Sequence, residues 1–189
     1  MKQQDYLDTI HKYVKDNKGL VGASKQSQID IERVGYQSNG KFKLGKMYSF
    51  RYYTPDEPKY DTYPLILSLG PSIDGHQLGL NLHYLPYNIK TDFLSRIIKS
   101  YSTFFTRQIS GNIIKNPKYQ PGLSGFNYNS LNEAFGRKYN FKHGIHQYNL
   151  NRIRMPVIIG YENWHLGALN NQNYFIGTNI NEAQSLYFS

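Results

Sequence analysis

Residues 47–86 constrain the fold more than any other stretch, because three short apolar strand patterns follow one another there. The patterns begin near residues 47, 64 and 78. A loop with two prolines joins the first two. An Asp74-Gly75 pair, which supplies the positive φ angles of a tight hairpin turn, lies between the second and third. Consecutive strands joined in this way predict a small antiparallel β-meander.

The side-chain pattern of each strand predicts which face is buried. In the first strand aromatic residues alternate with Ser49 and Arg51, so the rings face inward. The nearly continuous apolar run at 65–69 is typical of a central strand covered on both faces. In the third strand alternate apolar residues share one side, and Pro86 ends it. The predicted core contains Tyr48, Phe50, Tyr52, Leu65, Leu67, Leu80, Leu82 and Tyr84.

Helical patterns flank the meander. Residues 3–18 form a short amphipathic pattern that ends at Gly19. A second helix, capped by Asn88 or Thr91, places Phe93, Ile97, Tyr101 and Phe104 at spacings of three and four. The capping box Ser130-Leu-Asn-Glu133 predicts a third helix that runs to about Phe141. We therefore expect an α+β fold, with a small SH3-like β-meander or barrel core flanked by helices.

The chain length favours one domain with appendages. We expect an N-terminal helix and extended arm at 1–45, one α+β domain at 46–169 and a C-terminal tail at 170–189. Within the arm, residues 19–45 hold only isolated apolar residues such as Ile31, too few to build a core. The arm is a linker or orders on a neighbour, and its helix docks on another subunit or on its own domain. Residues 109–126 predict a long surface loop, and Pro156 to Ile159 a strand followed by packing of Trp164, Leu166 and Leu169.

Composition narrows the class of protein. The chain contains no cysteine, which excludes disulfides, Cys-ligated zinc, iron–sulfur clusters and thiol nucleophiles. It has no apolar run of membrane-spanning length and no signal-peptide pattern, so we expect it in the cytoplasm or in a particle assembled there. Its eighteen tyrosines suit a surface half buried against partners, or they reflect only the base composition of the genome.

The positive charge lies in one segment. Residues 87–155 hold eleven basic side chains against Asp92 and Glu133, a balance of +9 that equals the formal charge of the whole chain. Such a field attracts phosphate backbones or an acidic protein, or it belongs to a solvated face without a partner. The candidate partner-binding residues are Lys90, Arg96, Lys99, Arg107, Lys115, Lys118, Arg137, Lys138, Lys142, Arg152 and Arg154.

No motif in the chain predicts catalysis. His143 and His146 have the spacing of a helical metal pair, but no acidic ligand lies nearby, so ordinary exposed histidines are favoured. Asn81 and His83 project from one strand face and are expected to satisfy backbone groups. No nucleophile elbow, phosphate-binding loop or carboxylate cluster is present. We expect neither enzyme activity nor a cofactor or metal; a metal-dependent nuclease or hydrolase using His83 with Asp74 is a remote alternative.

Two motifs carry a family resemblance. Tyr60-Asp-x-x-Pro64-Leu-Ile-Leu, followed by Leu78-Gly-Leu-Asn-Leu-His-Tyr-Leu-Pro86, resembles small proteins of T4-like tailed bacteriophages. A later basic stretch also resembles that family, through Phe141 to Tyr148, Arg152-Ile-Arg154 and Glu162-Asn-Trp164. The resemblance spans about residues 42–166 and departs from the family at 109–127 and in the N-terminal arm.

The resemblance implies a virion structural, tail-assembly or DNA end-protecting role, and it brings no catalytic residues. We expect a non-enzymatic protein of the tail, baseplate or neck of a phage virion, docking on other virion proteins through its arms. The alternative is a protein that binds double-stranded DNA, or protects its ends, through residues 87–155. No membrane partner is expected.

Overall fold

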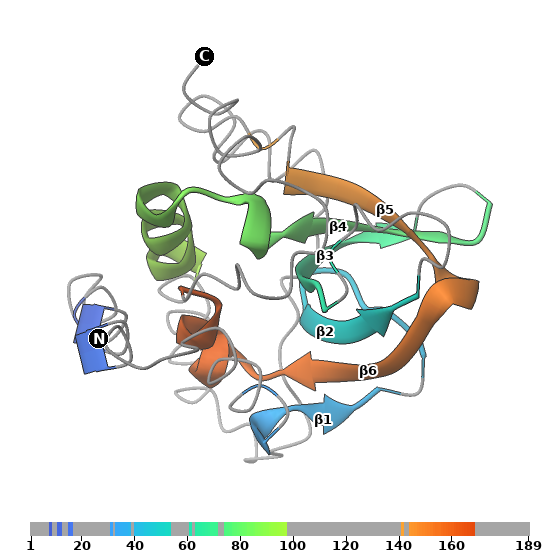
Figure 1. The fold of residues 1–189 in the computed structure, drawn as a ribbon, viewed down its shortest axis with the longest axis horizontal. Coiled ribbons are helices and arrows are strands. Elements are labelled where there is room, and N and C mark those ends of the chain that lie inside the picture. The colour runs from blue at the N-terminus through green and yellow to red at the C-terminus, as the bar shows by residue number, and fades with distance from the viewer. Residues whose placement is uncertain are drawn as a thin grey trace, which may run out of the picture.

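The fold is α+β, with one antiparallel sheet as its main element (Figure 1). The computed structural model describes residues 8, 11–12, 15–16, 31, 33–38, 40–53, 61, 63–71, 74–97, 141 and 144–168. Residues 87–97 are helical, as are the described residues between 8 and 16. No helix in the described ranges is both long and apolar enough to span a bilayer.

The sheet has six strands in the order β1-β6-β2-β3-β4-β5. Their bounds are β1 Tyr36–Gln37, β2 Met47–Tyr52, β3 Leu65–Pro71, β4 His76–Asn81, β5 Ile145–Asn149 and β6 Ile153–Ile159. Among the described residues the 3₁₀ helices are η1 Leu82–Tyr84, η3 Leu150–Arg152 and η4 Tyr161–Ala168. The consecutive antiparallel pairs β2–β3 and β3–β4 confirm the predicted meander.

The short connection η3 forces the sheet to curl. It joins β5, at one edge, to β6, which lies four positions away in the strand order. A flat sheet would separate these strands by about 19 Å, whereas three 3₁₀ residues rise only about 6 Å. One hydrogen bond spans the gap, since Asn149 N at the end of β5 donates to Tyr52 Oη of β2 at 3.1 Å. Tyr53 N donates to the Arg152 carbonyl at 3.0 Å, which extends the β2–β6 pairing into η3.

An aromatic cluster fills the concave side of the curled sheet. Tyr148 of β5 packs edge-to-face against both Phe50 and Tyr52 of β2, each at a centroid distance of 5.2 Å. These strands are three positions apart in the sheet, so only the curl brings their rings together. The members of the cluster are Tyr48, Phe50, Tyr52, Ile66, Tyr148 and Ile153, with Phe42 and Ile158 packed against them.

The opposite face of the sheet carries the larger aliphatic cluster. Alternate residues of β3 and β4 pack there against the helix at 87–97 and against Trp164 of η4, whose indole Nε1 donates to the Ile159 carbonyl at 3.0 Å. β3 is therefore covered on both faces, as its apolar run predicts. All eight side chains predicted for the core lie buried.

Local structure departs from the sequence pattern in two places. The third strand ends at Asn81 rather than near Pro86, because the Asn81 side chain caps the 3₁₀ turn η1. The helix that follows begins at residue 87, so neither Asn88 nor Thr91 is its cap. The predicted positive φ angles at Asp74 and Gly75 are confirmed, at 62° and 72°.

Part of the predicted arm belongs to the packed structure. Ile31 is fully buried in the aliphatic cluster, and β1 pairs with β6 through Tyr36 and Gln37. The apolar residues of the arm are too few to build a core of their own, but they do not need to, because their packing partners come from other elements of the chain. The predicted loop at 109–126, the helix from Ser130 and the tail at 170–189 lie outside the described residues, as do Tyr101, Phe104 and Leu169.

We predict that Gly79→Ala destabilises the fold by about 1 to 3 kcal/mol through overpacking. A Cβ at this position of β4 would lie 2.6 Å from Cδ1 and 3.0 Å from Cβ of Ile66, in the middle of the sheet. Urea denaturation measures the change in the free energy of unfolding. Gln147→Ala, on the exposed side of the neighbouring strand β5, is the control and is expected to change stability by less than about 0.5 kcal/mol. Equal stabilities of Gly79→Ala and the parent would contradict this packing.

Candidate functional site

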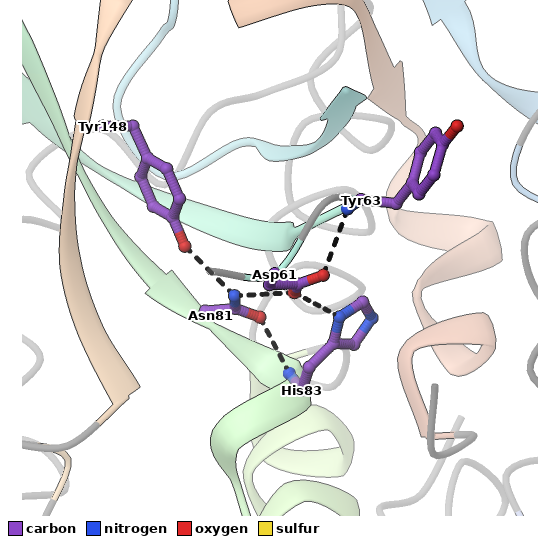
Figure 2. Close-up of polar contacts among 5 residues, drawn as sticks. All are labelled: Asp61, Tyr63, Asn81, His83 and Tyr148. Carbon is purple, nitrogen blue, oxygen red and sulfur yellow. Dashed lines mark hydrogen bonds and ion pairs between the residues drawn. The ribbon is translucent and has the colours of Figure 1, made fainter. Parts of the chain in front are cut away.

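A buried polar network links Asp61, Asn81, His83 and Tyr148 (Figure 2). The Asp61 carboxylate is its centre. Oδ2 pairs with His83 Nδ1 at 2.6 Å and accepts from Asn81 Nδ2 at 2.9 Å, while Oδ1 accepts from the Tyr63 amide at 3.1 Å. Asn81 Nδ2 also contacts Tyr148 Oη at 3.1 Å. The network thus joins the segment before β3, the end of β4 with the turn η1, and the C-terminal part of β5.

The network is structural because solvent does not reach it. Each of its four side chains is at most 2% exposed. Burial, reinforced by the Asp61 charge, raises the pKa of the Tyr148 hydroxyl well above its usual value of 10.0, so this phenol stays neutral. Asn81 Oδ1 meanwhile accepts from the His83 amide at 2.9 Å and so fixes the turn η1. The expectation that Asn81 satisfies backbone groups is confirmed here.

The nuclease alternative requires His83 to act together with Asp74, but the structure does not pair these two residues. The carboxylate partner of His83 is Asp61, while Asp74 is exposed in the β3–β4 turn and its carbonyl contacts His76 Nδ1 at 2.9 Å. Within the described ranges, no group of three or more His, Cys, Asp or Glu side chains is placed to hold a metal. His143 lies outside those ranges, and the His146 ring packs on Tyr84 at a centroid distance of 4.4 Å.

We predict that Asn81→Ala destabilises the protein by about 1 to 3 kcal/mol, because it removes a donor to a buried carboxylate. It also removes the cap of η1. Chemical denaturation measures the loss, and Asn151→Ala, an exposed position in η3, serves as the matched control. A similar loss in both variants would show that Asn81 has no special role.

The predicted basic residues do not share one environment. Arg152 and Arg154 are exposed on η3 and β6. Arg96 is exposed on the helix at 87–97 and pairs with Asp92 one turn earlier, at 3.1 Å. Lys90 is fully buried, so it does not belong to a binding surface in this fold. The other seven lie outside the described residues: Lys99, Arg107, Lys115, Lys118, Arg137, Lys138 and Lys142.

Burial lowers the pKa of Lys90 from its usual 10.5 to about 7. Between these two values the unfolded chain holds a proton that the folded chain lacks, so stability rises with pH across this window. Below about pH 7 both states are protonated and the full cost of burying the charge applies.

We therefore predict that Lys90→Met removes this pH dependence. Relative to the variant, the parent protein should gain about 3 kcal/mol of unfolding free energy between pH 6 and pH 9. Urea denaturation of both proteins at the two pH values measures the difference. Parallel pH profiles would show that Lys90 titrates normally.

An exposed arginine surface lies where β2 and β6 meet at the η3 end. Arg51 of β2 is directly opposite Arg154 of β6, and the ladder continues from Tyr53 to Arg152. We call the exposed residues Arg51, Tyr53, Arg152, Arg154 and Met155 the basic corner. Like charges directly opposite one another on a sheet are destabilising. No acidic side chain in the described part of the chain forms an ion pair with any of the three arginines.

Arg51 is the one arginine of the basic corner that the sequence prediction missed, and the prediction also left out Tyr53 and Met155. Arg51 lies outside the charged segment at 87–155, so the count of charges along the chain passed over it. The alternation in the first strand does place Arg51 on the face opposite the aromatic rings. Its pairing with Arg154 depends on tertiary structure, because β2 and β6 are about one hundred residues apart and neighbours only in the sheet.

A β-bulge shapes the basic corner at Met155. The pairs Ser49–Val157 and Arg51–Arg154 leave Met155 and Pro156 opposite the single residue Phe50. Pro156 suits the bulge because it has no amide hydrogen to place in the ladder. Met155 has φ 51°, a left-handed conformation that costs a residue with a side chain about 1 to 2 kcal/mol.

Comparison with known families gives one match. The family model of the phage T4 terminal DNA protecting protein matches residues 8–117. The chain belongs to this family. No curated protein and no solved structure matches the chain at the significance required.

The family match covers the β2–β3–β4 meander and the helix at 87–97, and it ends before β5 and β6. It supports the resemblance to proteins of T4-like phages and includes both motifs between Tyr60 and Pro86. Arg51 and Tyr53 of the basic corner lie inside the matched range, whereas Arg152, Arg154 and Met155 lie beyond it.

Proposed function

We propose that this protein binds double-stranded DNA at the ends of a linear phage genome and shields those ends from nucleases. The protection is non-catalytic: the bound protein occupies the terminus that an exonuclease must enter. Membership of the terminal DNA protecting family supports this role. The observation that carries it on the structure is the Arg51–Arg154 pair, two like charges held together with no described acidic partner.

The basic corner has the chemistry of a phosphate-binding surface. Arginine presents a planar set of donors that matches phosphate oxygens, and it keeps its charge at any physiological pH. Arg154 Nη1 donates to the carbonyls of Asn151 and Ile153 at 2.7 and 2.9 Å, which holds the guanidinium in place. A phosphate bound between Arg51 and Arg154 would relieve the repulsion between their charges. The bound anion would therefore stabilise the fold as well as the complex.

The sequence alone ranked a tail, baseplate or neck role above a DNA role. The family match reverses this order, because the family is described by DNA ends and not by a tail component. A location in the virion and docking on other virion proteins stay predictions. The described part of the arm argues against docking as its sole purpose, since Ile31 and β1 already pack within this chain.

We also propose that the core is an SH3-like barrel. Strands β6-β2-β3-β4-β5 form a curled sheet, and a 3₁₀ turn links the last two strands in the sequence. This order and this turn support the assignment. β1 and the helix at 87–97 are additions to such a core.

We predict that replacing Arg51, Arg152 and Arg154 together by Gln weakens binding to double-stranded DNA of any sequence. Each lost phosphate contact lowers the slope of log affinity against log salt by about 0.9, so the triple variant should lose about 2 to 3 from the slope. Fluorescence anisotropy between about 50 and 200 mM salt measures it. Digestion of linear DNA by an exonuclease in the presence of each protein tests the protection.

The matched control is Arg96→Gln, because this guanidinium is also exposed but already pairs with Asp92. We expect this variant to change the slope of log affinity against log salt by less than about 0.9, the value for one phosphate contact. If the triple variant keeps the parent slope, the basic corner does not bind phosphates. If the parent itself binds no DNA and gives no protection, the proposed function is wrong.

A further inference from the structure

Met155 is a strained apolar residue that the folded chain leaves in solvent. Its side chain is 81% exposed, and its backbone has φ 51° at a bulge position that glycine occupies without strain. Burial of the side chain therefore does not offset the strain. Residues held in this way mark functional contacts when the surrounding structure enforces the conformation. At Met155 the β2–β6 strand pairing on both sides of the bulge, together with Pro156, enforces the conformation.

The surroundings of Met155 indicate the chemistry of its partner. The neighbouring residue Arg154 faces Arg51 across the sheet, and Tyr53, at 56% exposed, lies directly after β2 and two residues beyond Arg51. Apolar and aromatic side chains thus lie among three arginines. The β5–η3–β6 turn that carries this surface lies at the right of Figure 1, across the sheet from the helix at 87–97 on the left. Neither this helix nor η4 covers it.

We propose that Met155 and Tyr53 cover the exposed face of the terminal base pair of a linear duplex while the arginines of the basic corner hold its last phosphates. This inference rests on the proposed function and assigns its contact to particular residues. Apolar side chains contact base faces in other settings, as wedges between base steps or as stacking platforms. Charge complementarity with the phosphates selects a nucleic acid over an apolar protein surface as the occupant.

The same contact discriminates ends from the interior of DNA. To reach a base face inside a duplex, Met155 must first unstack two base pairs, which opposes binding. The terminal base pair already exposes one face to water, so covering it removes apolar surface from solvent without unstacking. Phosphate contacts alone would bind ends and interior alike. End preference therefore depends on Met155, whereas overall affinity depends on the arginines.

The test compares two probes of the same sequence, each about 20 base pairs or roughly two helical turns long. One is a blunt duplex with two open ends. The other is closed at both ends by hairpin loops, so that it has the same duplex and its phosphates, with a few loop phosphates added, but no exposed terminal base pair. We expect the parent protein to bind the open duplex about tenfold more tightly than the closed one, and Met155→Gly to lower this ratio to near one.

Further variants separate apolar contact from folding. Met155→Gly relieves the positive φ, so its Tm should equal or exceed that of the parent. Met155→Leu keeps the apolar bulk and should keep the end preference. Tyr87→Ala removes an exposed aromatic side chain at the start of the helix at 87–97 and should leave both affinities unchanged. The Arg51, Arg152 and Arg154 triple variant should weaken binding to both probes equally.

Each outcome decides between the two proposals. If the parent prefers open ends and Met155→Gly keeps that preference, the end-capping inference is overturned and the proposed function stands. If the parent binds both probes equally, the preference for ends is absent and the inference is again overturned. If it binds neither probe, both proposals fail. If Met155→Gly loses the preference and keeps affinity for the closed probe, the inference is supported.

Discussion

The closure of one antiparallel sheet by the three-residue turn η3 is the constraint on which the rest of the structure depends. It brings β5 beside the ends of β2 and β6, so the Tyr148 ring can pack between Phe50 and Tyr52. Without this curl Phe50 and Tyr52 would lose the Tyr148 ring as a packing partner, and this side of β2 would be more exposed to water. The aliphatic cluster and Trp164 then cover the outer face, while Arg152 and Arg154 at the η3 end are exposed.

Two buried polar features of the core differ in their energetics. In the Asp61–Asn81–His83–Tyr148 network every side chain contacts another member, and a satisfied network of this kind fixes one arrangement of three distant segments. Lys90 is also buried, and because burial lowers its pKa to about 7, we expect the stability of the fold to fall as the pH drops toward 7. One feature specifies the fold, and the other limits its stability at low pH.

The proposed role of the basic corner depends on how the sheet places its charged and apolar side chains. The aromatic rings on the concave side stabilise β2 from one side, the side chain of Arg51 projects from the other, and the exposed Tyr53 lies directly after the strand. The bulge at Met155 belongs to the same ladder, so charge and apolar contact are held in a fixed relation before any partner binds. Such preorganisation lowers the entropic cost of binding. This is the structural basis for assigning DNA ends to this surface.

The sequence by itself determined what depends on neighbouring residues: the β2–β3–β4 meander from period-two alternation, the positive φ angles at Asp74 and Gly75, and the absence of thiol chemistry. Only the tertiary structure decided that Ile31 is core, that Lys90 is buried although its segment is basic, that His83 pairs with Asp61, and that Arg51 faces Arg154. The physical reason is common to all four. Each depends on contacts between segments that only sheet pairing and closure bring together, and local periodicity carries no information about such pairs.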